Sequence, residues 1–340
     1  MASFVAFDRA RYLERRALYR ARAGRLSRRV EPLWPFVGAW RALSSLATIR
    51  PDRLVLARLA RFPDGLRAYA GRAWLPGRGP IGFHPGVGRL GGGGAPFYDD
   101  NGWVGLCLLY EHRRTSSVGS LALARRVAEY VLTGWSDRPD EAHPGGIRWR
   151  SGPHDRSRNT CANGPAIALC VELAVLTGDE GWLEWAKRIY RWTAGALRGA
   201  DHLYRDAVDP EGRIDEHLWS YNQGTMIGGG VLLARATGDD AYRQEAVATA
   251  LATVAHFDRT VLLDEPFAFP AVLARNLLLL DEAEGAPGVH AWLGGFAEAV
   301  WRTRRVPADG RFVDPHSSPL NAAAGATELF ALLAGAVAAA

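Results

Sequence analysis

The chain has 340 residues, of which 48% are hydrophobic and 23% charged, so it is neither disordered nor fibrous, and it needs no disulfides or metals as staples. The formal net charge is +5, and residues 1–80 hold 17 Arg against five acids. Such a basic region can meet nucleic acid or anionic lipid. However, Lys187 is the only basic residue that is not Arg, so Arg is favoured along the whole chain, and we expect no nucleic-acid partner.

The opening residues, 1–30, mix many charges with short apolar pieces and contain no apolar core of a signal peptide. No run approaches the roughly 20 apolar residues of a membrane span, and the Ala-rich stretch 322–340 is interrupted by Glu328. The odd number of cysteines suggests buried free thiols in a reducing compartment, at Cys107, Cys161 and Cys170. We therefore expect a cytoplasmic protein without a membrane span.

Two types of apolar segment alternate along the chain. The first is apolar nearly all round and rich in Gly and Ala, as helices buried on every side are, and stands at 161–177, 226–236, 269–280 and 322–338. Counting helix pairs predicts inner helices near 33–49, 98–112, 160–177, 220–237, 266–281 and 320–338. The second has one apolar stripe at helical spacing and is predicted near 52–71, 119–134, 180–198, 240–257 and 289–304. The Arg-rich segment 8–23 is the candidate for a sixth helix of this type.

The junction between the two types repeats after 60 residues. Thr177-Gly178-Asp179 and Thr237-Gly238-Asp239 each place a glycine where a helix ends and an aspartate where the next begins. A helix-pair unit of this kind indicates an internal repeat, and alternating β patterns are absent. The sequence therefore predicts an all-α fold, an (α/α)₆ barrel that occupies 1–340 as a single domain and includes an Arg-rich N-terminal helix within 1–30.

Three long linkers rich in Gly, Pro and polar residues precede inner helices, at 75–96, 137–158 and 199–218. Loops of this length in a compact domain tend to carry function. Because all three lead into the N-termini of inner helices, we expect a binding site at that end of the barrel.

The first candidate site is the segment 97–103, in which Asp99 and Asp100 stand between the aromatic residues Tyr98 and Trp103 and are followed by Asn101. An aspartate at a helix start is often only an N-cap, which is the structural alternative. Two adjacent carboxyls repel each other, however, so one keeps its proton to higher pH than the other. Glycoside hydrolysis uses such a pair, which makes a carbohydrate cleft the favoured interpretation.

Two further inner helices begin with the same mixture of polar and aromatic groups. Trp149 follows a Gly-Gly turn, Asn159 and Asn163 lie at the next helix start, and Tyr221-Asn222-Gln223 open the helix after that. Amides donate and accept hydrogen bonds at once, which suits vicinal sugar hydroxyls. Capping and packing are the alternatives for each segment taken alone.

Other motifs carry little weight. A G-x-G-x-x-G match at 86–91 has no preceding strand, and the nine His form no H-x-x-x-H pair. No C-x-x-C and no G-x-S-x-G is present. We therefore expect neither a cofactor nor a metal.

Taken together, the segments resemble glycoside hydrolase family 76, the endo-α-1,6-mannanases. That family carries, in this order, the blocks that stand here as 98–103, 145–149, 159–164 and 221–224. The resemblance covers roughly residues 30–335 and implies an (α/α)₆ barrel that hydrolyses α-1,6-mannosidic bonds with retention. It also implies that Asp99 is the nucleophile and Asp100 the general acid/base. The sugar would be lined by the other residues of these blocks, Tyr98, Asn101, Trp149, Asn159, Asn163, Tyr221, Asn222 and Gln223.

The chain departs from the family pattern at Gly102, where Ala is usual, and at Arg148, where an aromatic residue is common. Arg148 suggests a charged or phosphorylated glycan. Secretion is typical of the family, so the absence of a visible export signal points to an internal or lipid-linked mannan. The partner expected is an oligo- or polysaccharide, and the chain is expected to be a monomer. The alternatives are an N-acylglucosamine 2-epimerase-like enzyme and a non-catalytic glycan-binding protein.

Overall fold

The structure is a computed structural model that describes residues 2–21, 29–70, 79–88, 93–153, 155–284 and 288–339. Part of the predicted loop 75–96, with the end of the G-x-G-x-x-G match, therefore lies outside the described residues. So does the segment 22–28 of the Arg-rich N-terminal region.

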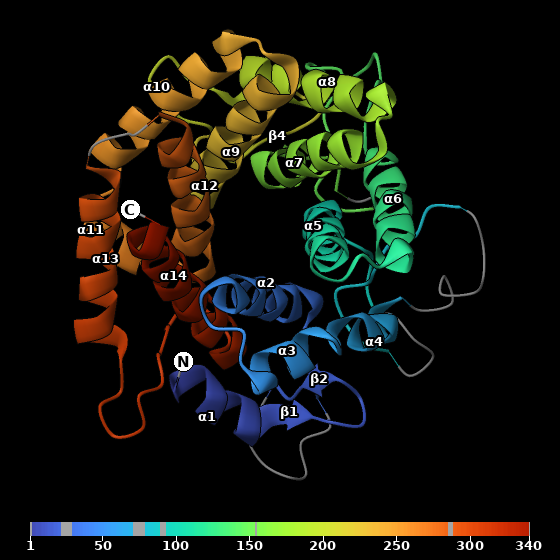
Figure 1. The fold of residues 1–340 in the computed structure, drawn as a ribbon. Helices are drawn as coiled ribbons and strands as arrows, with labels where there is room; N and C mark the ends of the chain where they lie inside the picture. Colours follow the sequence, from blue (N-terminus) through green and yellow to red (C-terminus); the bar gives the residue numbers. More distant parts are fainter. Residues whose placement is uncertain are drawn as a thin grey trace.

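Six inner helices form a closed ring in the described part of the chain. Each packs against the next in sequence order, and the last packs against the first (Figure 1). Each begins within two residues of its predicted start. Helices that are apolar on all sides, such as α7, are most stable at the centre of the barrel. They are α2 (Leu33–Ile49), α5 (Tyr98–Thr115), α7 (Thr160–Thr177), α9 (Ser220–Thr237), α12 (Ala268–Glu284) and α14 (Pro319–Ala339).

A second layer of helices surrounds the ring (Figure 1), and the predicted (α/α)₆ barrel is confirmed. The predicted helix 52–71 is divided into three shorter pieces, and the first outer helix is followed by a small hairpin. The outer elements are α1 (Ala2–Arg11), β1 (Tyr12–Leu13), β2 (Leu18–Tyr19), α3 (Arg53–Leu59), α4 (Phe62–Leu66), the 3₁₀ helix η1 (Arg67–Tyr69), α6 (Val118–Leu132), α8 (Glu180–Leu197), α10 (Asp240–His256), α11 (Arg259–Leu263) and α13 (Val289–Arg304).

The predicted outer helix 8–23 is wrong. The chain leaves the helix after ten residues and turns back through Ala17, which has a left-handed φ of 53°. The cause is a set of tertiary contacts. The carboxylate of Asp8 accepts a hydrogen bond from the hydroxyl of Tyr19 at 3.0 Å and forms a salt bridge with Arg58 at 2.8 Å. Both Asp8 and Tyr19 are fully buried, so this network holds the hairpin against α3 in place of a longer helix.

The repeated helix junction has the predicted form. Gly178 and Gly238 adopt left-handed φ angles of 69° and 73° and end α7 and α9. Asp179 and Asp239 each accept a hydrogen bond from the backbone N–H two residues later, at 3.0 Å in both cases. The same short connection therefore sets the angle between the inner and the outer helix in both pairs.

One helix, α7, is long and apolar enough to cross a membrane by length and composition, although the sequence reading expected no such segment. Two thirds of it (67%) is buried inside the barrel. Burial of this extent is the ordinary environment of an inner helix.

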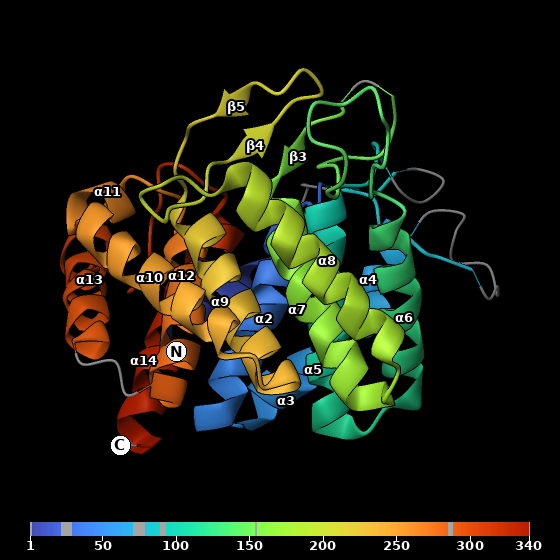
Figure 2. The ribbon, with the colours of Figure 1, turned by 90° about the horizontal axis from the view of Figure 1, so that it is seen from above.

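The long loops gather at one end of the barrel, above the N-termini of the inner helices (Figure 2). Within the described residues they contain a small antiparallel sheet and no parallel one, as expected. Its strands are β3 (Arg158–Asn159), β4 (Ala207–Val208) and β5 (Ile214–Asp215), which join the loop before α7 to the loop before α9. The predicted placement of the linkers 137–158 and 199–218 is confirmed.

Candidate active site

A cleft of about 900 Å³ opens among these loops. It is lined mainly by aromatic rings and carboxyl groups, the two kinds of group that recognise and cleave sugars. The aromatic wall residues are Trp34, Phe97, Trp103, Trp149, Trp219, Tyr221 and Phe269. The carboxylates are Asp99, Asp100, Asp155, Asp206, Asp209 and Asp215.

Asp99 lies in the first turn of α5 and is half-buried. One carboxylate oxygen accepts the backbone N–H of Asp100 at 2.8 Å, and the other accepts the indole N–H of Trp149 at 3.2 Å. Burial raises the pKa of Asp99 to about 6, while these hydrogen bonds and one from the thiol of Cys161 act in the opposite direction. Asp99 is therefore held as an anion near neutral pH by donors aimed at it.

Asp100 lies beside it and is only 8% exposed, yet it reaches the cleft wall. Burial raises the pKa of Asp100 well above its usual range, and the negative charge of Asp99 raises it further. Its side chain accepts no backbone N–H of its own helix, and the N-cap position belongs to Phe97, which makes no side-chain cap. Helix capping therefore does not account for Asp100.

The indole that contacts Asp99 is positioned by backbone pairing. The N–H of Trp149 donates to the carbonyl of Ser157 at 2.9 Å, and its carbonyl accepts the N–H of Tyr98 at 2.9 Å. Since successive side chains of an extended segment point to opposite sides, Trp149 faces the cleft and Arg148 does not. The suggestion that Arg148 selects a charged glycan is therefore wrong, because its side chain is not on the cleft wall.

Asn163 is not a sugar-binding residue, contrary to the sequence prediction. It is fully buried, and its amide is used entirely by backbone groups. The side-chain oxygen accepts the N–H of Ile147 at 2.9 Å, and the side-chain nitrogen donates to the carbonyls of Ile147 at 3.1 Å and Asn159 at 2.9 Å. Asn163 thus fixes the extended segment that carries Trp149.

Asn101 and Gln223 occupy the equivalent position, the fourth residue of α5 and of α9, and the predictions for them are wrong for the same reason. Both are fully buried. The side-chain oxygen of Asn101 accepts the N–H of Phe83 at 2.7 Å, and its nitrogen donates to the carbonyl of Phe83 at 3.0 Å. Gln223 makes the same two hydrogen bonds with Tyr204, at 2.8 Å each. Three inner helices therefore use one amide each to clamp the loop beside them.

Two other predicted sugar contacts also lie behind the wall. Tyr98 is 3% exposed and stacks on Tyr130 at a ring distance of 5.2 Å. Asn222 is fully buried and donates to the carboxylate of Asp206 at 3.0 Å. Neither side chain reaches the cleft surface, so Asn222 can act on a ligand only through Asp206.

Five predicted residues do come together on the cleft wall, from three different helix starts and one loop. Their placement agrees with the sequence reading, while their individual roles stay predictions. They are Asp99, Asp100, Trp149, Asn159 and Tyr221.

Asp206, in the loop 199–218, is a residue of the cleft wall that was not predicted from the sequence. Its carboxylate lies on the cleft wall, where it accepts hydrogen bonds from Asn222 at 3.0 Å and Asn159 at 3.5 Å, and burial raises its pKa. The only available signal was its position in a long loop of the predicted end, which does not distinguish it from its neighbours Asp201 and Asp209.

The charge of the cleft limits what it can bind. Even with Asp100 protonated, five aspartates face Arg213 as the single basic residue of the described wall, so a polyanionic glycan would be repelled. The described residues contain no group of His, Cys, Asp and Glu that could hold a metal ion. A neutral saccharide that stacks on tryptophan rings and hydrogen-bonds to carboxylates suits this surface.

A helical toroid with a pair of unlike aspartates at the base of an aromatic cleft is the architecture of an α-helical glycoside hydrolase. The family comparison agrees, because a sequence model of glycosyl hydrolase family 76 matches residues 93–287. This match covers more than half of the chain. The chain belongs to glycoside hydrolase family 76.

Individual relatives are more distant. The chain is 27% identical to a mannan endo-1,6-alpha-mannosidase DCW1 of Candida glabrata, over 54% of this chain and 42% of that protein. It therefore spans less than half the length of this curated relative. The family 76 mannosidase Bt3792 of Bacteroides thetaiotaomicron has the same fold, with a TM-score of 0.84 and 19% identity over 98% of this chain and 96% of that one.

A third similar protein is the alpha-1,6-mannanase GH76A of Salegentibacter sp. Its TM-score is 0.80 and its identity 22%, over 99% of this chain and 97% of that one. That structure is of an inactive variant with two consecutive aspartates replaced by asparagine, in complex with alpha-1,6-mannotriose.

Proposed function

We propose that this protein hydrolyses internal α-1,6-mannosidic linkages of a mannan or mannan-containing glycan with retention of configuration. The observation that carries the proposal is the adjacent pair Asp99 and Asp100 in one cleft. Burial raises the pKa of Asp99 to about 6, and burial together with the charge of Asp99 raises the pKa of Asp100 well above its usual value. A retaining glycosidase needs one carboxylate and one carboxylic acid at the same time.

In the proposed reaction, Asp99 attacks the anomeric carbon while Asp100 donates its proton to the departing glycosidic oxygen. A covalent glycosyl ester with Asp99 results, and the shortened glycan leaves. Asp100, now ionised, takes a proton from water, which attacks the same carbon and releases Asp99. The indole N–H of Trp149 stabilises the carboxylate of Asp99 whenever it is free.

The substrate class is supported by the relatives and by the character of the wall. The curated relative carries endo-1,6-alpha-mannosidase in its name, and a similar fold is known with alpha-1,6-mannotriose bound. The cleft of about 900 Å³ is large enough for several sugar units and presents several aromatic rings. Its excess of carboxylates favours an uncharged mannan over a phosphorylated one.

The test is incubation with linear α-1,6-mannooligosaccharides, with products followed by mass spectrometry and the first-formed anomer by NMR. Asp99→Asn and Asp100→Asn should each abolish turnover while the circular dichroism spectrum stays unchanged. Asp240→Asn is the matched control, because Asp240 also lies in the first turn of a helix, α10, but on the outer surface. It should retain full activity.

Two outcomes would contradict the proposal. Full activity in Asp99→Asn or Asp100→Asn would exclude the assigned roles, and an inverted first product would exclude the covalent intermediate. Mannan binding by calorimetry without new reducing ends would instead identify a glycan-binding protein.

We also propose that the protein resides in a reducing compartment such as the cytoplasm. The three cysteines, Cys107, Cys161 and Cys170, are all buried and unpaired, which supports this. Fractionation of the source cells with antibody detection tests it, and recovery from the medium would contradict it.

A further inference from the structure

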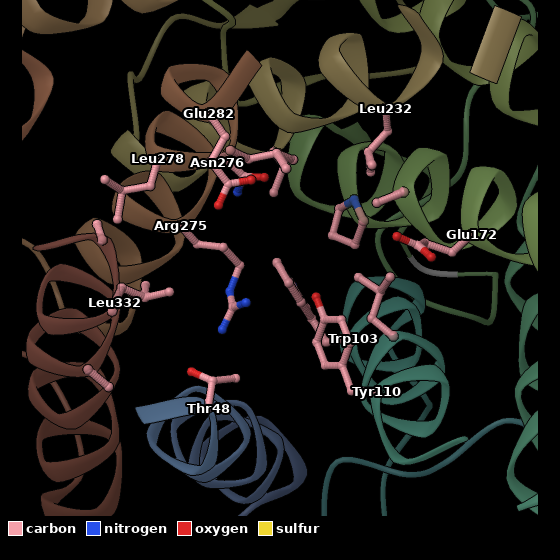
Figure 3. A pocket seen from close by; sticks show the side chains of 18 of the residues that line it. Thr48, Trp103, Tyr110, Glu172, Leu232, Arg275, Asn276, Leu278, Glu282 and Leu332 are labelled. Carbon is pink, nitrogen blue, oxygen red and sulfur yellow. The ribbon is translucent and has the colours of Figure 1, made fainter. Parts of the chain in front are cut away.

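A second cavity, of about 920 Å³, lies at the end of the barrel opposite the cleft. Side chains of the inner helices line it (Figure 3), most of them from the C-terminal halves, whereas Trp103, Pro165 and Thr225 lie nearer the N-termini of their helices. The side chain of Trp103 borders both spaces. The proposed hydrolysis makes no use of this cavity.

A buried charge cluster lies beside this cavity and has an excess of positive charge. Glu328 is fully buried and accepts hydrogen bonds from Arg41 at 2.7 Å and from Arg275 at 2.7 Å. These two guanidinium groups hold the pKa of Glu328 below its usual value, so it is ionised. Two cations thus share one anion. The guanidinium of Arg41 lies over the rings of Trp103 and Trp34, at 4.5 and 5.6 Å, and does not line the cavity. The excess positive charge can therefore meet a further anion only at Arg275.

Arg275 is the member of the cluster that reaches the cavity. Its side chain extends from α12 into the space and is 22% exposed (Figure 3). Its Nη2 donates to Glu328 at 2.7 Å and to the hydroxyl of Ser45 at 2.6 Å, and its Nε donates to Glu328 at 3.0 Å, so the guanidinium is fixed in orientation. A fixed guanidinium with donors still facing the cavity suits a carboxylate.

The other charged residues on the described wall do not cancel this excess. Glu172 pairs with Arg113, and Glu282 lies 4.0 Å from Arg235 with most of its side chain in solvent. Each acid is accompanied by its own base. The net positive charge therefore stays with the cluster around Arg275.

The rest of the wall is mostly aliphatic, in contrast to the cleft. Its aliphatic lining includes leucines from three helices, Leu232, Leu278, Leu279 and Leu332. Such a wall binds a hydrocarbon chain through the hydrophobic effect and offers little to a sugar.

We propose that this cavity binds the carboxylate of a fatty acid, with the head group on Arg275 and the chain along the leucines towards the opening. This site is separate from the cleft and does not depend on the proposed hydrolysis. The excess positive charge of the cluster requires the carboxylate, and the aliphatic wall requires the hydrocarbon chain.

The test is isothermal titration of the full-length protein with sodium decanoate, decanol and decylammonium. These probes share one chain and differ in charge. Decanoate should bind with one site per chain, and the other two at least tenfold more weakly. Absence of decanoate binding, or equal binding of decanol, would overturn the proposal.

Two variants locate the site. Arg275→Gln keeps the Arg41–Glu328 pair and should weaken decanoate binding about ten- to hundredfold, the range for loss of a hydrogen bond to a charged group. Ala168→Phe fills the middle of the cavity from α7 and should abolish binding even if Arg275→Gln fails to fold. Arg302→Gln, an exposed charge on α13, is the control and should bind as the parent does. Unchanged decanoate binding in Ala168→Phe would place the ligand elsewhere and refute the assignment.

Discussion

Replacement of Asn163 by alanine tests whether the buried amides build the site from behind the cleft wall. The substitution removes three hydrogen bonds, two to Ile147 and one to the carbonyl of Asn159. At about 1 kcal/mol for each hydrogen bond, the free energy of unfolding should fall by about 3 kcal/mol. The N–H and carbonyl of Ile147 would remain buried without partners, so this value is a lower limit.

The expected change in melting temperature follows from the size of the chain. An unfolding entropy near 2.1 cal/mol/K per residue gives about 0.7 kcal/mol/K for 340 residues, so Tm should fall by about 4 °C. Catalysis should fall as well, because the released segment carries Trp149, whose indole contacts Asp99. Differential scanning calorimetry and mannooligosaccharide turnover measure the two effects.

Asn276→Ala is the matched control. Asn276 also lies on an inner helix, α12, and also bonds to the carbonyl four residues earlier, that of Val272 at 2.8 Å, but it clamps no loop. It should lose about 1 kcal/mol and leave turnover unchanged. If Asn163→Ala is no less stable than Asn276→Ala, the clamp contributes nothing, and the reasoning is refuted.

Further predictions concern charge. The rate at low substrate concentration should rise with pH through about 6, because Asp99 ionises there. It should fall at higher pH as Asp100 loses its proton. A flat pH profile of the rate between pH 4 and 9 would contradict these roles. Folding raises the pKa of Asp100, so the native state binds more protons than the unfolded chain, and the free energy of unfolding falls as pH rises above about 4. Asp100→Asn removes this loss. It should therefore raise Tm at pH 7 and not at pH 3, which thermal scans can check. Glu328→Gln leaves Arg41 and Arg275 buried without their anion and should cost about 3–5 kcal/mol in denaturant titrations, whereas a loss below 1 kcal/mol would show that the cluster is well hydrated.

The sequence by itself determined the barrel and the end of it that carries the site. Helices that are apolar all round, such as α7 and α9, have one stable place, and the Gly-Asp junctions at Gly178 and Gly238 act through local backbone geometry. Both signals are short-range and can be read from neighbouring residues. The pairing of Asp99 and Asp100 is equally local, because adjacent carboxyls repel in any fold.

Only the tertiary structure decided which polar residues face the cleft. Asn163 and Asn159 stand four residues apart in similar surroundings, yet one is buried as a loop clamp and the other lies on the wall. The difference depends on how the loop directly before α7 folds back onto Asn163, 16 residues away, just as the hairpin depends on Tyr19 reaching Asp8, 11 residues away. Hydrogen bonds between a side chain and a non-helical segment leave no periodic pattern in the sequence, and for that reason these contacts became visible only in the folded chain.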